Sequence, residues 1–235
     1  VPDGVTPQEA AFTTLGTDSM HGVRQGRVGL GDRVVVLGTG LIGQMAAQMA
    51  RLNGGHVMVV GNNNERRVEL ASKLGAEVVV LAASEDPVKA VSKFTDGMGA
   101  DVVLMCAAPS GKGVMGQCLE MVRKNGRIVV VGLTELEFKF LEWHRTEAEL
   151  LISRAYGPGR HDPEYEEKGI DYPFNFVRWT LNRNMQEFLT LVAQKKLDIK
   201  SLISHTFPVD DAAAAFDLVV NRHDEITCVL FEYPE

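Results

Sequence analysis

The sequence has few cysteines, and no two of them lie close together. Cys106, Cys118 and Cys228 are the three in 235 residues, so no Cys-x-x-Cys pair indicates a zinc knuckle. Three widely separated cysteines also argue against a disulfide framework. Apolar neighbours surround Cys106 and Cys118, which favours core packing for both.

Basic charge and long hydrophobic runs are scarce as well. Lys and Arg number 24 against 31 Asp and Glu, a formal net charge of −7, and the pair Arg66-Arg67 is too short to make a basic patch. We therefore expect no nucleic-acid partner and no anionic membrane partner, because nothing is present to neutralise their phosphates. The sequence shows neither a signal-peptide pattern nor an apolar run of membrane-spanning length, which predicts a cytoplasmic protein.

The most informative stretch is a short apolar run from Val34, followed by Gly38-x-Gly40-x-x-Gly43 and a helix-forming segment. A strand, a glycine-rich turn and a helix in this order bind the pyrophosphate of a dinucleotide. Gly38 permits the tight turn, Gly40 lets the backbone approach the phosphates, and Gly43 lets the helix pack on the strand. The N–H groups and positive dipole end of the helix favour the anion. The residues predicted to bind cofactor here are Gly38, Thr39, Gly40, Leu41, Ile42 and Gly43.

Strand and helix signals alternate from residue 32 to residue 132. The predicted strands are continuous Val, Ile and Leu runs, which is typical of a parallel sheet covered on both faces. This predicts an α/β fold, a Rossmann doubly wound parallel sheet flanked by helices, with its ligand crevice at the carboxyl ends of the strands. The strands are expected over 33–37, 56–60, 78–81, 101–105, 127–131 and 149–153, and the helices over 41–53, 64–74, 87–94 and 113–123.

The pattern loosens after residue 132. We expect a long ordered loop over 156–171, helices over 184–194 and 210–221, and a final strand over 227–231. The chain divides on this basis into a lead-in segment (1–30), a dinucleotide-binding domain (31–155) and a C-terminal extension of loop, helices and strand (156–235).

Several stretches beyond the glycine turn carry a family resemblance. They are Arg67-x-x-x-Ala71-x-x-Leu74-Gly75-Ala76, the run 96–103, the run 126–132, the opening Val1-Pro2-Asp3-Gly4 and the late His205-x-Phe207-Pro208. With them the chain resembles the medium-chain dehydrogenase/reductase (zinc-type alcohol dehydrogenase-like) superfamily. The resemblance implies a cofactor domain and a C-terminal tail that packs on a GroES-like catalytic domain, whose N-terminal part this sequence lacks. We expect either a fragment continuous with that upstream domain or a natural half-protein.

The resemblance also implies a partner and further cofactor contacts. A homodimer would form by edge-to-edge sheet pairing near residues 150–153, and Thr17 would lie near the nicotinamide. The turns after the fourth and fifth strands would flank the ring. Their predicted cofactor-binding residues are Cys106, Ala107, Val131, Gly132 and Leu133.

A polar segment narrows the resemblance. Tyr156-Gly157-Pro158-Gly159-Arg160-x-Asp162-Pro163, with later Asp-Tyr-Pro and Val-Arg-Trp-Thr motifs, is similar to the bi-domain oxidoreductases of bacterial surface-sugar gene sets. Tyr156, Arg160 and His161 are candidate contacts for a small, hydroxyl-rich substrate. The alternative is a loop whose polar groups bond one another and pin its own turns.

The end of the second strand bears on the choice of cofactor. An NAD site usually has an acidic residue there, which bonds the ribose hydroxyls, whereas this sequence has Asn62. Asparagine does not repel a 2′-phosphate, and Arg66 and Arg67 follow one turn later, with guanidinium groups suited to grip phosphate. We therefore favour NADP(H) over NAD(H). The alternative is that both arginines belong to a solvated helix face.

No metal site is expected. Zinc members of the superfamily take one ligand from a position that corresponds here to Thr13 or Thr14, and neither hydroxyl suits zinc. His21 lies nearby, but a single histidine is more often a packed residue than a ligand.

These patterns predict an NAD(P)(H)-dependent oxidoreductase, zinc-free, that transfers hydride between nicotinamide and an alcohol or carbonyl, with a sugar-linked substrate as one option. The rival hypothesis is a non-catalytic NAD(P)-binding module for sensing or docking. S-adenosylmethionine binding also uses a glycine-rich first turn, but the Gly-x-Gly-x-x-Gly spacing argues against it. The sequence does not identify a catalytic acid.

Overall fold

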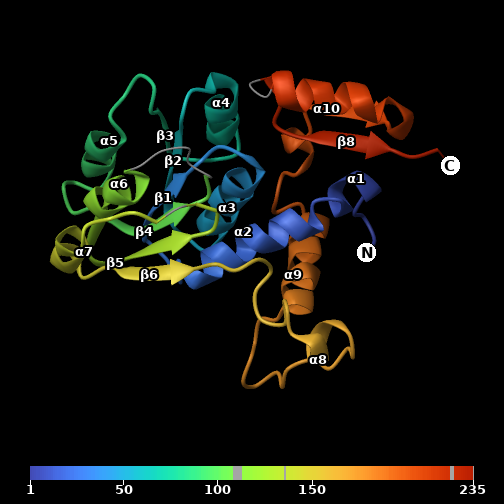
Figure 1. The fold of residues 1–235 in the computed structure, drawn as a ribbon, viewed down its shortest axis with the longest axis horizontal. Helices are drawn as coiled ribbons and strands as arrows, with labels where there is room; N and C mark the ends of the chain where they lie inside the picture. Colours follow the sequence, from blue (N-terminus) through green and yellow to red (C-terminus); the bar gives the residue numbers. More distant parts are fainter. Residues whose placement is uncertain (108–112, 135, 223–224, 235) are drawn as a thin grey trace.

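The glycine-rich turn follows the first strand in the sequence, which lies third in the spatial order of a six-stranded parallel sheet. This computed structural model describes residues 1–107, 113–134, 136–222 and 225–234. The strands lie in the order β3-β2-β1-β4-β5-β6, each parallel to its neighbours (Figure 1). Their bounds are β1 Arg33–Leu37, β2 His56–Gly61, β3 Val78–Leu81, β4 Ala100–Met105, β5 Val122–Val130 and β6 Glu149–Ile152. The predicted doubly wound fold is confirmed.

Both faces of the sheet are buried, because alternate residues of each strand enter different cores. In β1, Val34 and Val36 belong to the core that contains α3, whereas Val35 and Leu37 belong to the core that contains α5 and α6. This explains why the strands are continuous apolar runs. The helices in the body of the sheet are α3 Leu41–Leu52, α4 Glu65–Lys73, α5 Pro87–Phe94, α6 Val114–Met121 and α7 Phe140–Thr146.

Two helices lie in the lead-in segment, where no helix is predicted above. They are α1 (Pro7–Ala10) and α2 (Thr13–Gln25). Small polar residues give α2 no clear hydrophobic periodicity in the sequence. Their hydroxyl groups donate hydrogen bonds to backbone carbonyls of the same helix. Thr17 Oγ1 donates to the Thr13 carbonyl at 2.7 Å, and Ser19 Oγ donates to the Leu15 carbonyl at 2.9 Å.

The C-terminal part differs from the predictions in three details. A short helix α8 (Pro163–Glu166) lies within the expected loop, and the helix expected from residue 210 begins as a 3₁₀ turn, η2 Val209–Asp211, before α10 (Ala212–Asn221). A missed strand β7 (His205–Pro208) pairs in parallel with β8 (Val229–Glu232). A four-residue strand that ends in proline gives too short a pattern to identify. The helix α9 (Leu181–Ala193) and the 3₁₀ turn η1 (Lys200–Leu202) complete this part.

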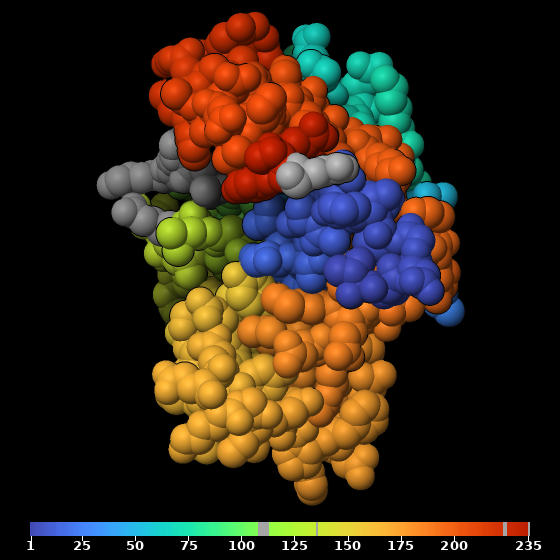
Figure 2. Space-filling model, turned by 90° about the vertical axis from the view of Figure 1, so that its right-hand side faces the viewer, coloured from blue at the N-terminus to red at the C-terminus, as the bar shows by residue number. Residues whose placement is uncertain are grey.

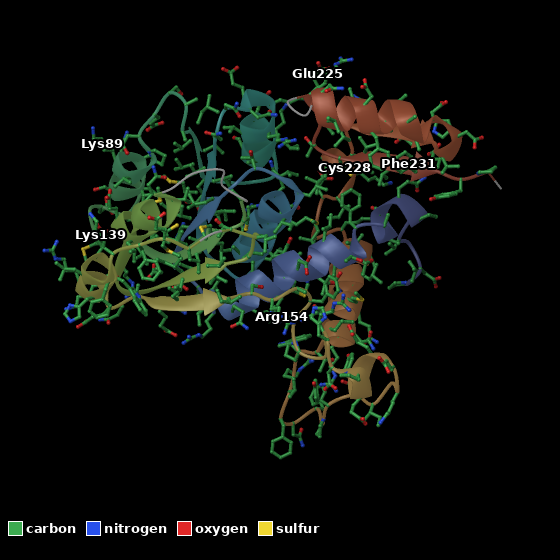
Figure 3. All side chains as sticks on the ribbon, viewed as in Figure 1. Lys89, Lys139, Arg154, Glu225, Cys228 and Phe231 are labelled. Atoms are coloured by element: carbon green, nitrogen blue, oxygen red, sulfur yellow. The ribbon has the colours of Figure 1, made fainter. Side chains whose placement is uncertain are left out.

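The N-terminal helices lie between two C-terminal segments. Figure 2 shows the face on the right of Figure 1, with the N-terminal residues between the tail of α10 and β8 above and the segment around α8 below. Figure 3 labels Cys228 and Phe231 in that tail, far from Lys139 near α7. Among the residues that the structure describes, no helix is long and apolar enough to cross a membrane.

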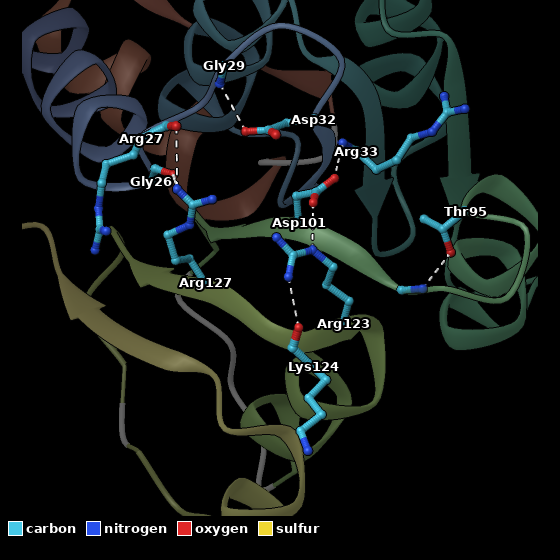
Figure 4. Close-up of polar contacts among 11 residues, drawn as sticks. Gly26, Arg27, Gly29, Asp32, Arg33, Thr95, Asp101, Arg123, Lys124 and Arg127 are labelled. Atoms are coloured by element: carbon cyan, nitrogen blue, oxygen red, sulfur yellow. Dashed lines mark hydrogen bonds and ion pairs between the residues drawn. The ribbon is translucent and has the colours of Figure 1, made fainter.

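Polar contacts tie the strands together at the amino edge of the sheet, opposite the glycine turn (Figure 4). Asp101 accepts from the Arg33 backbone N–H at 2.7 Å and from Arg123 Nε at 2.6 Å. Burial raises the pKa of Asp101, but these hydrogen bonds and the guanidinium charges lower the pKa overall. Arg127 Nη1 donates to the Gly26 carbonyl at 3.0 Å and so fixes the end of α2.

The position of α2 depends on its packing against Phe188 of α9. Phe188 is 0% exposed, and a Cβ built on Gly16 would lie 2.1 Å from its ring. We predict that Phe188→Ala lowers the free energy of unfolding by about 3 to 5 kcal/mol, measured by urea denaturation. The control is Phe176→Ala, because Phe176 is 88% exposed and should change stability by less than about 0.5 kcal/mol. Equal effects of the two substitutions would contradict this packing.

Candidate dinucleotide-binding site

The glycine turn brings three backbone segments into contact. Gly38 has φ +115°, and a Cβ there would lie 2.8 Å from the backbone nitrogen of Ala107. A Cβ on Gly43 would lie 2.0 Å from the Gly38 carbonyl oxygen. The Gly38 N–H donates to the Val60 carbonyl at 2.8 Å. Both glycines are therefore required by packing, as the sequence predicts.

Gly40 is different, because it is not packed against the rest of the described chain. It is exposed, its backbone is extended (φ −73°, ψ −179°), and a Cβ there would meet no described atom within 4 Å. Gly40 caps α3 without a side-chain hydrogen bond, and the Gln44 N–H donates to its carbonyl at 2.9 Å. The first N–H groups of α3 have no partner within the helix. An open cradle at a helix N-terminus fits the pyrophosphate of a dinucleotide.

The turns after β4 and β5 meet the glycine turn at the carboxyl edge of the sheet. The N–H groups of Cys106 and Ala107 donate to the Leu37 carbonyl at 2.9 and 2.8 Å. Those of Val131 and Gly132 both donate to the Met105 carbonyl at 2.9 Å. The structure thus brings together the predicted ring-flanking turns, with Leu133 beyond them at 94% exposure. Their contact with a cofactor stays a prediction.

Helix α2 runs beside this edge. Ser19 Oγ donates to the Ile42 carbonyl at 3.1 Å, which joins α2 to the start of α3. Thr17, one of the predicted nicotinamide neighbours, is 0% exposed. His21 is buried, with its Nε2 3.4 Å from Gln25 Nε2. Burial and the charge of Arg24 lower the pKa of His21.

Thr13 and Thr14, the two threonines at the position of the family's zinc ligand, lie at the start of α2. Thr13 Oγ1 donates to the Ala10 carbonyl at 2.6 Å, and Thr14 is exposed. Over the described ranges, no three His, Cys, Asp or Glu side chains gather as a metal site would require.

The residues after β2 adopt two distinct roles. Asn62 is exposed, whereas Asn64 is buried and caps α4 by accepting from the Arg67 N–H at 2.9 Å. Arg67 Nε donates to the Ile226 carbonyl at 2.8 Å, and Arg66 Nη1 donates to the Glu225 carbonyl at 3.2 Å. Both guanidinium groups thus contact the C-terminal tail. Arg66 is exposed and Arg67 is partly buried, and a sequence pattern gives no signal for either contact.

Arg67 also borders an apolar groove of about 460 Å³ between α2, α3 and the tail. Aromatic and aliphatic side chains from segments far apart in the sequence form most of its lining, among them Phe12, Leu15, Leu41, Phe216 and Phe231. Charged ligand groups would gain little there.

The candidate substrate residues lie in a segment that satisfies its own polar groups. Arg160 pairs with Glu166 and lies over the Tyr156 ring, 5.6 Å from its centre. His161 is exposed. The Tyr156 carbonyl accepts from Asn184 Nδ2 at 3.1 Å. These contacts favour the alternative of a self-pinned loop, and the substrate role stays a prediction.

Sequence reasoning missed two polar residues at the same edge of the sheet. Within the described residues, Asp18 Oδ1 and Ser153 Oγ are buried and have no hydrogen-bond partner, and Gln44 Oε1 is the third such side-chain atom. Burial raises the pKa of Asp18 from 3.8 to about 6. The one available signal was an acidic residue directly after Thr17, within a helix of small side chains.

The raised pKa of Asp18 predicts how the free energy of unfolding changes with pH. The unfolded chain ionises Asp18 near pH 4, whereas the folded chain keeps the proton until about pH 6, so the free energy of unfolding falls as pH rises between these values. We predict that Asp18→Asn leaves stability unchanged at pH 4 and raises it by about 1 to 2 kcal/mol above pH 6, allowing for solvent screening because Asp18 as a whole is only partly buried. Urea denaturation of both proteins at pH 4 and pH 8 measures this. A pH-independent difference would contradict it.

Known proteins are similar to this chain in sequence and in fold. The family model "Zinc-binding dehydrogenase" matches residues 42–170. Sorbitol dehydrogenase of Halalkalibacterium halodurans is 30% identical over 225 residues, which cover 93% of this chain and 57% of that protein. The chain thus spans somewhat more than half the length of the curated relatives it matches.

Solved structures match over nearly the whole chain. An Escherichia coli oxidoreductase/dehydrogenase of unknown specificity involved in membrane biogenesis superimposes with a TM-score of 0.84 at 24% identity, covering 100% of this chain and 60% of that one. A candidate zinc-binding dehydrogenase from Sinorhizobium meliloti, bound to NADP, gives 0.72 at 23% identity, with coverage of 94% and 58%. A short chain alcohol dehydrogenase from E. coli complexed with NADH gives 0.76 at 17% identity, with coverage of 97% and 60%.

The family model, the curated relative and the solved structures all indicate the same family. The family match covers more than half of the chain, and the six-stranded parallel sheet with a glycine turn after β1 is the expected cofactor-binding fold. This chain belongs to the zinc-binding dehydrogenase family, within the medium-chain dehydrogenase/reductase superfamily.

Proposed function

We propose that this chain binds a nicotinamide dinucleotide at residues 38–43 and is the cofactor-binding part of an NAD(P)(H)-dependent alcohol or carbonyl oxidoreductase. The observation that carries this proposal is the open cradle at Gly40. Packing forces glycine at Gly38 and Gly43, but no described residue occupies the space that a Gly40 side chain would fill. A bound pyrophosphate accounts for glycine at that position.

The cofactor supplies the hydride chemistry, and the protein supplies binding and orientation. The start of α3 would hold the pyrophosphate through its backbone N–H groups. Thr17 and the turns after β4 and β5 would border the nicotinamide, where small residues such as Ala107 and Gly132 leave room for a flat ring. A built Cβ on Gly132 would lie 2.6 Å from the Ala107 carbonyl, so these two turns are packed against each other before any ligand binds.

We propose a polyol or sugar-linked alcohol as the substrate class. Support comes from sorbitol dehydrogenase among the relatives. We further propose a zinc-free reaction as far as this chain contributes, because the hydroxyls of Thr13 and Thr14 are poor zinc ligands.

The proposal is tested by filling the cradle. Serine is a good N-cap residue, so Gly40→Ser should keep the fold and its melting temperature. Its hydroxymethyl group would occupy the phosphate position and cap the amides itself, so we predict at least a tenfold loss of NADPH affinity in fluorescence titration.

The control is Gly116→Ser in α6, where a built Cβ likewise meets none of the described atoms within 4 Å. Unchanged affinity in Gly40→Ser would overturn the proposed site. Cofactor binding by the full-length protein, catalytic part included, without turnover of any alcohol, aldehyde or quinone would instead support a sensing or docking module.

We also propose that NADP(H) is preferred over NAD(H). Asn62 follows β2 and is exposed, so it presents no carboxylate to a 2′-phosphate, and Arg66 is exposed one turn later. We expect NADPH to bind more tightly than NADH.

Two substitutions should change this preference in a defined direction. We predict that Asn62→Asp weakens NADPH binding by about tenfold or more and leaves or improves NADH binding, because a carboxylate repels the phosphate and bonds ribose hydroxyls. Arg66→Ala should weaken NADPH alone. Asn63→Asp, one residue further from β2, is the matched control. Tighter binding of NADH than NADPH by the unaltered chain would refute the preference.

A further inference from the structure

Two buried polar atoms without partners lie at the carboxyl edge of β5 and β6. Asp18 Oδ1 and Ser153 Oγ have no hydrogen bond within the described part of the chain. Ser153 is 6% exposed and Asp18 is partly buried. A buried polar group left unpaired costs free energy, so two of them at one edge of the sheet indicate a position where a polar ligand group completes the structure.

The packing of α2 places Asp18 over this edge. Gly22 lies against the turn after β5, because a Cβ there would be 2.7 Å from Val131 Cγ2. Asp18 precedes Gly22 by one helical turn and therefore lies on the same face of α2. The hydrogen bond from Ser19 Oγ to the Ile42 carbonyl sets this part of α2 beside the glycine turn.

Ser153 lies at the same carboxyl edge, at the end of β6. It follows β6 directly, and its N–H donates to the Val130 carbonyl at 2.8 Å. This bond continues the β5–β6 register, in which Val130 pairs with Ile152, so Ser153 lies alongside Val131. Figure 3 shows the next residue, Arg154, between the end of β6 and α2.

Two arginines, Arg24 in α2 and Arg27 just beyond its end, are engaged elsewhere. Arg24 Nε donates to Asn184 Oδ1 at 3.1 Å, and its guanidinium lies 3.4 Å from the centre of the Trp179 ring. Arg27 pairs with Glu149 at the amino edge of the sheet. Among the described residues, Asp18 has no ion pair. Its carboxylate is therefore available to a ligand.

We propose that Asp18 and Ser153 bind the carboxamide group of the nicotinamide ring. Asp18 Oδ1 accepts a hydrogen bond from the carboxamide N–H, and the Ser153 hydroxyl donates to the carboxamide oxygen. The inference rests on the proposed cofactor binding and deepens it. It assigns the group that fixes which face of the ring is presented to substrate.

The chemistry of the pair matches this group. An ionised carboxylate only accepts hydrogen bonds, a hydroxyl can donate one, and a primary amide offers both a donor and an acceptor. Two ligand atoms are thus satisfied by the two unpaired protein atoms. At pH 8 the carboxyl is ionised, since its pKa is about 6.

The test compares NADPH with its reduced 3-acetylpyridine analogue, in which a methyl group replaces the amide nitrogen. Both retain the carbonyl oxygen, but only NADPH has an N–H to donate. We expect Asp18→Ala in the full chain to weaken NADPH binding by about 10- to 100-fold at pH 8 and to change analogue binding by less than about threefold. Asp18→Asn retains an acceptor oxygen and should lose less affinity.

Ser153→Ala provides the complementary result. It should weaken both compounds by about the same factor, on the order of three- to tenfold, because both keep the carbonyl oxygen. Asp217→Ala, which alters a helical aspartate on α10, is the control and should change neither affinity. Melting temperatures of all variants show whether the fold is retained.

The outcomes are distinguishable. Equal losses for both compounds in Asp18→Ala, or no loss, would overturn the inference and leave the proposed cofactor binding intact. Failure of the unaltered chain to bind either compound would overturn the proposed function and the inference together.

Discussion

The close approach of α3 to the turn after β1 is the constraint on which the rest of the site depends. A methyl group at Gly43 would lie 2.0 Å from the Gly38 carbonyl, and one at Gly38 would lie 2.8 Å from the Ala107 nitrogen. Only with both side chains absent can the first N–H groups of α3 reach the carboxyl edge of the sheet. The contact between Ser19 of α2 and the Ile42 carbonyl depends on the same position of α3.

The sheet and most of its helices could be predicted from the sequence, because their information is local. Continuous apolar runs reflect burial on both faces, and single residues mark the helix ends. Pro87 begins α5, and Gly75 follows the end of α4 with φ +99°. The glycine turn could likewise be predicted from local sequence, since three glycines at fixed spacing determine both the close packing and the open cradle.

The remaining parts could not be predicted because they depend on residues far away in the sequence. Helix α2 shows weak periodicity, and its position is fixed by Gly16 against Phe188 and Gly22 against Val131. The contacts of Arg66 and Arg67 with the carbonyls of residues 225 and 226 span 159 residues. A sequence pattern identifies two arginines suited to phosphate but not the carbonyl groups that bind them in the fold.

The distribution of unpaired polar atoms separates residues that look functional in the sequence from residues that we propose contact a ligand. The polar segment after β6 is conspicuous in the sequence, yet Arg160 pairs with Glu166 and Tyr165 donates to Thr180 at 3.1 Å. Asp18 and Ser153 are inconspicuous, yet each leaves a buried oxygen unsatisfied. Folding gains nothing from such atoms, whereas a ligand with matching donor and acceptor groups does. The ligand contacts that we propose for this chain therefore lie where α2 crosses the carboxyl edge of the sheet, beside the glycine turn.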